Sequence, residues 1–435
     1  MSYVCFTDEK GTHSIDHAAT LIDCDRSQAG SSFHAYWNIV CCVCGVGMLG
    51  LSQSLSKGGW GALALIILSW LMTLYCSVIL IQCLYHPRNK QDPVRLASIP
   101  AVAQDAFGPI GGWFAFFFQT WIVLGIPILH FVLAGANMNQ LCRGTAAEIG
   151  QVQWTIIFCA LVSFPYVFFK SMKDTGWTSV FGALAIIITT LICVIVAGID
   201  ENSRLGDSPP VIHNSIIWQG YPAALSNISV SFSGNVAFPS IEAAMKKPQH
   251  WTRVITTSLT TCVFLYILIA VPGYYVYGAS VQNPMYNSLP DGIPRTISIA
   301  LITISVIMSA PIFLITFTLE CEERMNITVE RWGRRRELVF RIGFRLLTMI
   351  ACATIGCVVP FFDLLMALFG AVGCSTTIFI IPVLCYFRLT GFGNKSLYVL
   401  AWNFLILVFG TVGLAFGSWF AVEDLVHAFQ KSSKS

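Results

Sequence analysis

Long apolar runs separated by short polar segments form the main pattern along this chain. A helix needs about 20 mostly apolar residues to cross the hydrocarbon core of a bilayer, and eleven runs come close to or exceed that length. They cover residues 36–55, 60–85, 111–141, 152–170, 177–199, 223–245, 254–278, 295–320, 339–359, 362–387 and 397–421. The pattern predicts an all-α polytopic membrane protein with eleven transmembrane helices.

The polar segments at the two ends set the expected domain boundaries. Residues 1–33 are polar and mixed in charge, and we expect a cytosolic N-terminal tail there. Residues 34–425 contain every apolar run and form one expected transmembrane domain, and residues 426–435 form a short C-terminal tail.

The third run is longer than one membrane crossing requires. It contains Pro127, and proline removes a backbone hydrogen bond inside a helix, so we expect this span to tilt or kink. Residues 96–107, directly before it, predict a short interfacial helix on the cytosolic side. Runs nine and ten are separated only by residues 358–361, which predict a tight turn.

Composition agrees with a surface that faces lipid. Charged residues make up only 11% of the 435 residues, whereas soluble domains carry about 25%. The net charge of +3 gives no indication of a nucleic-acid partner. Twelve of the 16 cysteines lie inside apolar runs, where a thiol behaves as a small hydrophobe. We therefore expect neither a metal site nor a disulfide framework.

The basic residues are distributed unevenly between the two sides. Of the 25 Lys and Arg residues, 19 lie in segments on the side of the N-terminal tail and six on the other side. By the positive-inside rule the first side is cytosolic. Eleven spans then place the C-terminus on the luminal or extracellular side. The 324–345 segment holds seven of the arginines, which we interpret as solvated charge near lipid headgroups.

Two runs contain residues that suit a continuous helix poorly. The first run holds Gly45, Gly47 and Gly50 within six positions, and each glycine weakens a helix by about 1 kcal/mol relative to alanine. The sixth run holds five serines with Gly234, Asn235 and Pro239 from position 226 to position 240, at mid-membrane depth. Non-helical backbone is tolerated there only where it is buried or lines a cavity.

The position of these two runs predicts a transport site. Interrupted helices at matching positions of two halves are typical of transporters with inverted repeats, here spans 1–5 and 6–10. Freed N–H groups suit a carboxylate and freed carbonyls suit an ammonium group, so a zwitterionic amino acid would find both. The alternative is that the glycines only allow close packing of helices.

A family resemblance supports the same interpretation. Residues 34–86 resemble the first two spans of the amino acid/auxin permease family, in Asn38, Gly45-x-Gly47-x-Leu49-Gly50-Leu51 and Gly58-Gly59-Trp60. Residues 231–292 add Phe238-Pro239-Ser240-Ile241-Glu242, then Met245 and Pro248, and later Asn287-Ser288-Leu289-Pro290. Within the family the chain is similar to the vesicular inhibitory and fungal vacuolar amino acid transporters.

The resemblance implies a leucine-transporter-like fold with a 5+5 inverted repeat and amino acid transport driven by a proton gradient. It implies that the substrate contacts Gly45, Val46, Gly47, Gly50, Phe232, Ser233, Gly234 and Asn235. Many members have proline at the place of Ser52, and some have histidine at the place of Asn235. These departures bear on substrate range and coupling rather than on the fold. The pocket part of span 6 lacks a charged side chain, which favours small neutral amino acids.

Two sets of residues could bind the coupling ion. Glu242 follows the break in span 6, and a carboxylate at that depth is a functional candidate for proton binding. Alternatively, Glu242 pairs with Lys246 four residues later on a helix surface. Sodium is the rival ion, with neutral oxygens from Asn38 and from Thr303, Ser305 or Ser309 of span 8.

Other function classes explain fewer of these features. A multispan acyltransferase would use His130 as a base with Asn137, but few polar groups accompany that histidine, and we interpret both residues as satisfied interior groups. An amino-acid-sensing receptor could use the same pocket. We expect a monomeric transporter without enzymatic activity or a bound cofactor, in a vacuolar or vesicular membrane, with the plasma membrane as the alternative.

Overall fold

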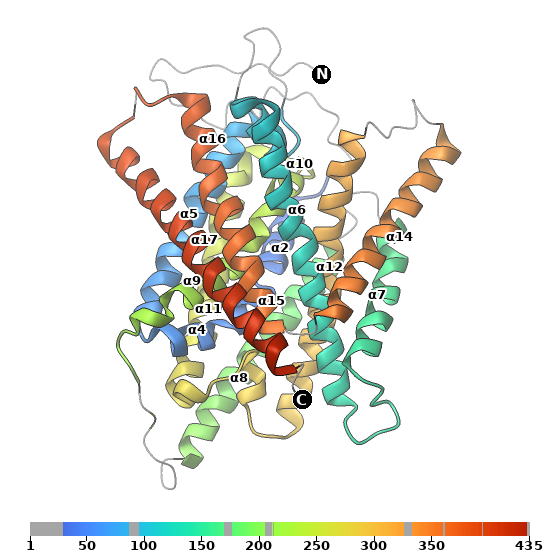
Figure 1. Ribbon diagram of the computed structural model, residues 1–435, viewed down its shortest axis with the longest axis vertical. Helices are drawn as coiled ribbons and strands as arrows, with labels where there is room; N and C mark the ends of the chain where they lie inside the picture. The colour runs from blue at the N-terminus through green and yellow to red at the C-terminus, as the bar shows by residue number, and fades with distance from the viewer. Residues whose placement is uncertain are drawn as a thin grey trace.

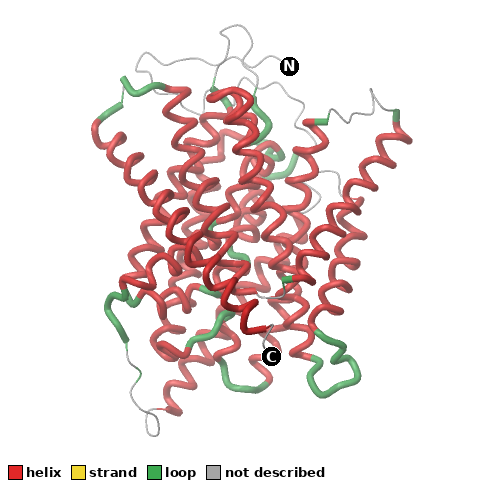
Figure 2. Tube along the Cα trace, viewed as in Figure 1, coloured by secondary structure: helices red, strands yellow, loops and turns green. Residues whose placement is uncertain are grey.

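The computed structural model describes residues 29–86, 95–168, 176–204, 211, 213–325, 333–359, 362–393 and 395–432. Over these residues the chain is helical, with Gly30 and Met245 forming an isolated bridge rather than a strand. Figure 2 shows the helices running mostly along the long axis, joined by short loops. The predicted all-α polytopic fold is confirmed.

The helical elements follow one another in this order. They are α2 (Ser32–Val43), α3 (Val46–Leu49), α4 (Leu51–Gly58), α5 (Gly61–Leu84), α6 (Ile99–Leu141), α7 (Gln151–Phe168), α8 (Gly176–Arg204), η1 (Trp218–Gly220), α9 (Tyr221–Ser231), η2 (Ser233–Ala237), α10 (Phe238–Ala243), η3 (Pro248–His250), α11 (Trp251–Tyr277), η4 (Gly278–Ser280), η5 (Met285–Ser288), α12 (Ile293–Arg324), α14 (Arg334–Val358), α15 (Phe362–Leu368), the π-helical η6 (Phe369–Ile380), α16 (Ile381–Thr390) and α17 (Leu397–Ser432).

Each predicted apolar run corresponds to helix. Within the described part of the chain, eight helices are long and apolar enough to span a membrane, and Gln151–Val167 is a shorter apolar helix. The first run is divided into α2, α3 and α4, and the sixth into α9, η2 and α10. The structure therefore has interrupted helices at the two predicted positions, whereas the count of eleven membrane crossings stays a prediction.

Hydrogen bonds join the helix ends that the charge pattern assigned to one side. The backbone N–H of Leu96 donates to Leu84 at the end of α5, and Gly30 pairs with Ala244 after α10. Arg388, near the end of α16, donates to Ala106 in the first part of α6. We call this the basic end, at the top of Figure 1, where α14 and α17 also begin. Which compartment it faces stays a prediction.

Three details differ from the sequence prediction. α6 leaves the helical conformation at Gly108 (φ 74°, ψ −167°), which glycine adopts readily, so residues 99–107 form the expected short helix. Pro127 lies within the helical part that follows, and the bend expected there stays a prediction. α14 begins at Arg334, five residues before the predicted start of that span, and Arg345 is buried. α17 continues to Ser432, into the predicted tail.

The inner and outer helices differ sharply in burial. In the most apolar window of α12, 72% is buried, against 22% in α14 and in α17. α12 packs along α6 and α8, and α9 packs against η6. The interrupted helices thus lie inside the bundle, where freed backbone groups are shielded from lipid.

Candidate functional site

Span 1 is interrupted where its glycines predict. α2 ends at Val43, and Gly45 has φ −78° and ψ −149°, which an α-helix cannot include. α3 then starts at Val46, and a second step at Gly50 separates it from α4. The break leaves N–H groups in the first turn of α3 and carbonyls in the last turn of α2 without the usual helical partners.

Span 6 changes helix type at the matching place. α9 ends at Ser231, and Phe232 leaves the helical region with φ −104° and ψ 11°. The 3-10 segment η2 follows, and α10 begins at Phe238 with Pro239 in its first turn. A 3-10 segment shifts backbone bonding by one residue, so part of the backbone here is released from the α-helical pattern.

The two breaks touch each other. A Cβ placed on Gly47 would lie 2.6 Å from Ser231 Cα, and one on Gly234 would lie 2.7 Å from a methyl carbon of Val43. The hydroxyl of Tyr266, in α11, donates to the carbonyl of Val43 (2.7 Å) and lies against the carbonyl of Ser231. One side chain thus satisfies carbonyls freed by both breaks.

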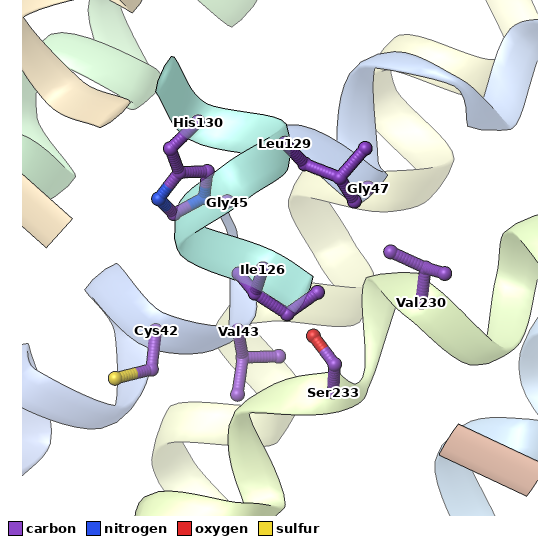
Figure 3. A pocket seen from close by; sticks show the side chains of 9 residues that line it. All are labelled: Cys42, Val43, Gly45, Gly47, Ile126, Leu129, His130, Val230 and Ser233. Carbon is purple, nitrogen blue, oxygen red and sulfur yellow. The ribbon is translucent and has the colours of Figure 1, made fainter. Parts of the chain in front are cut away.

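A cavity opens beside this junction (Figure 3). Its walls are Cys42, Val43, Gly45, Gly47, Ile126, Leu129, His130, Val230 and Ser233. The space open to the centre of a water molecule is about 10 Å³, which is about the room that one water needs. In this conformation the chain is closed around the site, and an amino acid would require the surrounding helices to move.

Three predicted substrate residues line this cavity. They are Gly45, Gly47 and Ser233, and the hydroxyl of Ser233 points toward Ile126 in Figure 3. Val46 lies between the two glycines in the chain, and its side chain is outside the described residues. That these residues contact a substrate stays a prediction.

Gly50 is placed elsewhere. A Cβ on Gly50 would lie 2.7 Å from the terminal methyl of Met366 and 3.1 Å from the side-chain amide of Asn283. Its neighbours are thus α15 and the loop before η5, and it is absent from the cavity walls described above. The prediction that Gly50 contacts the substrate has no support in this geometry, and close packing explains the glycine.

The other predicted residues of span 6 surround the junction. Phe232 packs its ring edge-on against Tyr266 at 5.3 Å, and Gly234 lies against the last turn of α2. Asn235 is fully buried, and neither atom of its amide has a hydrogen-bond partner among the described residues. Since an unsatisfied buried amide costs about 1–3 kcal/mol, Asn235 is suited to a polar partner that arrives with another conformation or a ligand.

His130 is a polar lining residue that the sequence analysis interpreted as an interior group. Its Nδ1 lies 3.3 Å from the hydroxyl of Ser309, and its Nε2 would lie 3.7 Å from a Cβ on Gly45. It faces the break in span 1 from α6 (Figure 3). Its apolar sequence neighbours suggested an interior group, and only three-dimensional proximity reveals the cavity.

Asn137 has the interior role predicted for it. Its Nδ2 donates to Thr303 (3.1 Å), and its Oδ1 accepts from the hydroxyl of Tyr286 (2.6 Å). Thr303 also donates to the carbonyl of Ile299 (2.7 Å).

The predicted sodium ligands are not brought together. Thr303 is engaged with Asn137, and Ser305 donates to the carbonyl of Gly182 in α8 (2.9 Å). Asn38 is buried, and its Oδ1 has no hydrogen-bond partner among the described residues. The sodium alternative would require a rearrangement of α12.

Glu242 is held by a partner that the sequence could not indicate. Arg95 donates from Nε (2.9 Å) and Nη2 (2.6 Å) to Oε2, and Tyr85 donates to Oε1 (2.5 Å). Arg95 also donates to the carbonyl of Pro239 (2.7 Å). The alternative pairing with Lys246 is wrong, because the carboxylate faces Arg95 and the lysine is exposed.

This arrangement ties α10 to the ends of two other elements. Glu242 is fully buried and the side chain of Arg95 is only 9% exposed, and removing one partner of such a buried pair is strongly destabilising. Tyr85 follows α5, and Arg95 precedes α6. These contacts therefore hold α10 of span 6 against the end of α5 and the start of α6 at the basic end.

Comparison with known proteins identifies the family. Residues 28–423 match the family described as transmembrane amino acid transporter protein. The chain belongs to this family. It is 25% identical over 430 residues to the amino acid transporter AVT1J of Arabidopsis thaliana, covering 95% of this chain and 96% of that one. It is 24% identical to the vesicular inhibitory amino acid transporter of Rattus norvegicus, covering 93% and 78%.

A solved structure shares the fold. The manganese transporter of Eremococcus coleocola superposes with a TM-score of 0.56 over 91% of this chain and 88% of that one, at 10% identity. This transporter family member is thus a multi-pass integral membrane protein with the fold predicted from its two interrupted helices. The acyltransferase alternative is wrong, since the relatives are transporters.

Proposed function

We propose that this family member is a secondary active transporter of small neutral amino acids. The observation that carries the proposal is the cavity at the junction of the two breaks, which is lined by backbone and small or apolar side chains with His130 and Ser233 as its polar groups. Among its described lining residues none is a lysine, arginine, aspartate or glutamate. A charged substrate side chain would find no opposite charge there.

The backbone would recognise the two charges common to all amino acids. N–H groups at Gly45, Val46 and Gly47 precede or begin α3, where the first turn lacks intrahelical acceptors, so they suit the carboxylate. Carbonyls at Phe232, Ser233 and Gly234 suit the ammonium group. Tyr266 already occupies the carbonyls of Val43 and Ser231, which leaves the later carbonyls of span 6 for the substrate.

Transport would follow an alternating-access cycle. The cavity of about 10 Å³ is far smaller than an amino acid, because that volume suits a single water molecule. Opening toward the basic end would separate α10 from Arg95 and Tyr85, and closing would restore those bonds. The substrate would stay at the same junction while the helices around it move.

We propose a proton gradient as the driving force, with no resident cofactor. Two observations favour protons over sodium: Thr303 and Ser305 are bonded to other groups, and buried carboxylates are available. Glu242 stays a predicted proton-binding residue, and its substitution tests that assignment. The proposed location is a vacuolar or vesicular membrane, with the N-terminus cytosolic and the C-terminus luminal, and the proposed state is a monomer.

Transport by the purified full-length chain tests the proposal. The protein in liposomes should take up labelled alanine or glycine when a pH gradient is imposed, and labelled lysine and glutamate should compete poorly. Sodium-dependent uptake would retain transport but overturn proton coupling. Folded protein that moves no amino acid under either gradient would favour the receptor alternative.

A further inference from the structure

A second cavity lies between the substrate site and the basic end. It offers about 40 Å³ to the centre of a water molecule, several times what one water needs. Its polar walls come from the segment before α6, from α6, α10 and α12, and are Ser98, Gln119, Ser240, Thr316 and Glu320. Gln119 lies seven residues before Ile126 of the substrate cavity on α6, or about 10 Å along a helix.

Glu320 is the buried carboxylate of this cavity, with a residue exposure of only 6%. Its Oε2 accepts from Nε2 of Gln119 at 2.5 Å, and its Oε1 accepts from the hydroxyl of Ser98 at 3.3 Å. Arg324, one turn later on α12, approaches Oε1 with Nε at 3.4 Å. Ser98 and Gln119, which donate to Glu320 across the cavity, are both neutral groups. They belong to the segment before α6 and to α6.

Arg324 is a weak partner for this carboxylate. Its guanidinium carbon lies 4.4 Å from the ring centroid of Phe116 and 5.5 Å from that of Trp113, so the charge is directed largely toward aromatic faces. The contact of its Nε with Glu320 is at the long limit of a hydrogen bond. The contact at 3.4 Å contrasts with the 2.6 Å contact between Arg95 and Glu242.

The side-chain amide of Gln119 has only one of its two polar atoms in a hydrogen bond. Its Nε2 donates to Glu320, but its Oε1 is buried and has no hydrogen-bond partner among the described residues. An amide oxygen beside an ionised carboxylate can only be repelled by it. Once the carboxyl is protonated, its O–H can donate to this oxygen after the amide turns, so protonation would satisfy the orphaned acceptor.

We propose that Glu320, with Gln119, is the proton-binding site through which the pH gradient drives amino acid transport. A proton from water at the basic end adds to a carboxylate oxygen of Glu320, and the same proton leaves to water when the cycle reverses. The neutral carboxyl and the turned amide then join α12 to α6 in a different hydrogen-bond pattern. Val236 and Pro239 of span 6 line the same cavity. A new hydrogen-bond pattern at Glu320 would therefore act on the substrate site through span 6.

The surrounding groups support a single titrating site. Apart from Glu320, none of the described residues that line this cavity ionises near neutral pH. Arg324 and Cys321 accompany it on α12, and the ion pair of Arg95 with Glu242 borders the cavity through the carbonyl of Pro239, to which Arg95 donates. Across the cavity Glu320 accepts from Ser98 and Gln119, and protonation of its carboxyl would turn the Gln119 amide.

The inference rests on the proposed transport function, and counterflow separates the two. Exchange of labelled for unlabelled alanine across liposomes at equal pH needs substrate binding and movement but no net proton flow. Glu320→Gln should retain exchange within about threefold of the unsubstituted protein. Its uptake should no longer respond to a pH gradient, whereas one coupled proton allows up to about tenfold accumulation per pH unit.

A matched carboxamide variant and a variant of the rival carboxylate complete the experiment. Glu423→Gln, at an exposed carboxylate of α17, should keep the response to the pH gradient. Glu242→Gln tests the rival assignment and is compared through the ratio of its gradient response to its exchange, because it also leaves the buried Arg95 without its carboxylate. If Glu320→Gln does not fold, Glu320→Asp retains a titrating carboxyl and should respond with a shifted pH midpoint. An unchanged response in Glu320→Gln, or its loss only in Glu242→Gln, would overturn the assignment. Absence of exchange in the unsubstituted protein would instead reject the transport function.

Discussion

The backbone of Gly47 in span 1 lies directly against Ser231 in span 6. An added Cβ on Gly47 would come within 2.6 Å of Ser231 Cα and 2.7 Å of Ser231 N. These are backbone atoms, so no rotation of a side chain could relieve the clash. The contact joins the two halves of the fold at the point where both helices are interrupted.

Replacing Gly47 should therefore disrupt transport. Gly47→Ala would force the breaks apart, and overpacking of this kind costs about 1–3 kcal/mol, enough to reduce uptake about tenfold or more. Gly198→Ala in α8 is the matched control, because a Cβ there meets nothing within 4 Å. Uptake of labelled alanine by both variants decides the matter, and normal uptake by Gly47→Ala would contradict the contact.

The hydroxyl of Tyr266 should stabilise the junction. Tyr266→Phe keeps the ring against Phe232 but leaves the carbonyls of Val43 and Ser231 without their donor, a loss of about 1–3 kcal/mol for buried groups. We expect a lower melting temperature in detergent together with reduced uptake.

Tyr398 offers a control for that substitution, since it is 88% exposed. Tyr398→Phe should leave both measurements unchanged. An unchanged melting temperature in Tyr266→Phe would show that water replaces the lost hydroxyl and that the tyrosine has no bridging role.

The pairing of Arg95 with Glu242 predicts a difference between two basic residues. Arg95→Ala leaves a buried carboxylate without its cation, which typically costs about 3–5 kcal/mol. We expect poor thermal stability and little uptake. Lys246→Ala removes an exposed side chain and should change neither. If Lys246→Ala proved as damaging as Arg95→Ala, the ion pair would have a different partner in the membrane.

These residues show which parts of the site a sequence can reveal. Gly45, Gly47 and Ser233 interrupt a helical pattern locally, so their position in the cavity could be predicted. Gly50 has the same local signature but packs against Met366 and Asn283, which belong to distant segments.

Contacts between distant segments of the chain could not be predicted from the sequence. Arg95 and Glu242 are 147 residues apart, and nothing in either local pattern selects one for the other. Glu320 is the last residue of the predicted span 295–320, where a carboxylate is ordinarily interfacial. Only the packing of α6 against α12 places Gln119 over it.

His130 should contribute to substrate affinity more than to stability. Its Nε2 side faces the break at Gly45, while Nδ1 is held by Ser309. His130→Gln retains a polar group of smaller reach, and we expect KM for alanine to rise about tenfold, equivalent to the loss of one hydrogen bond of about 1.4 kcal/mol, with an unchanged melting temperature. His427→Gln, on the exposed part of α17, is the control. A lower melting temperature with unchanged KM would make His130 a packing residue and would leave substrate recognition to the backbone of the two breaks.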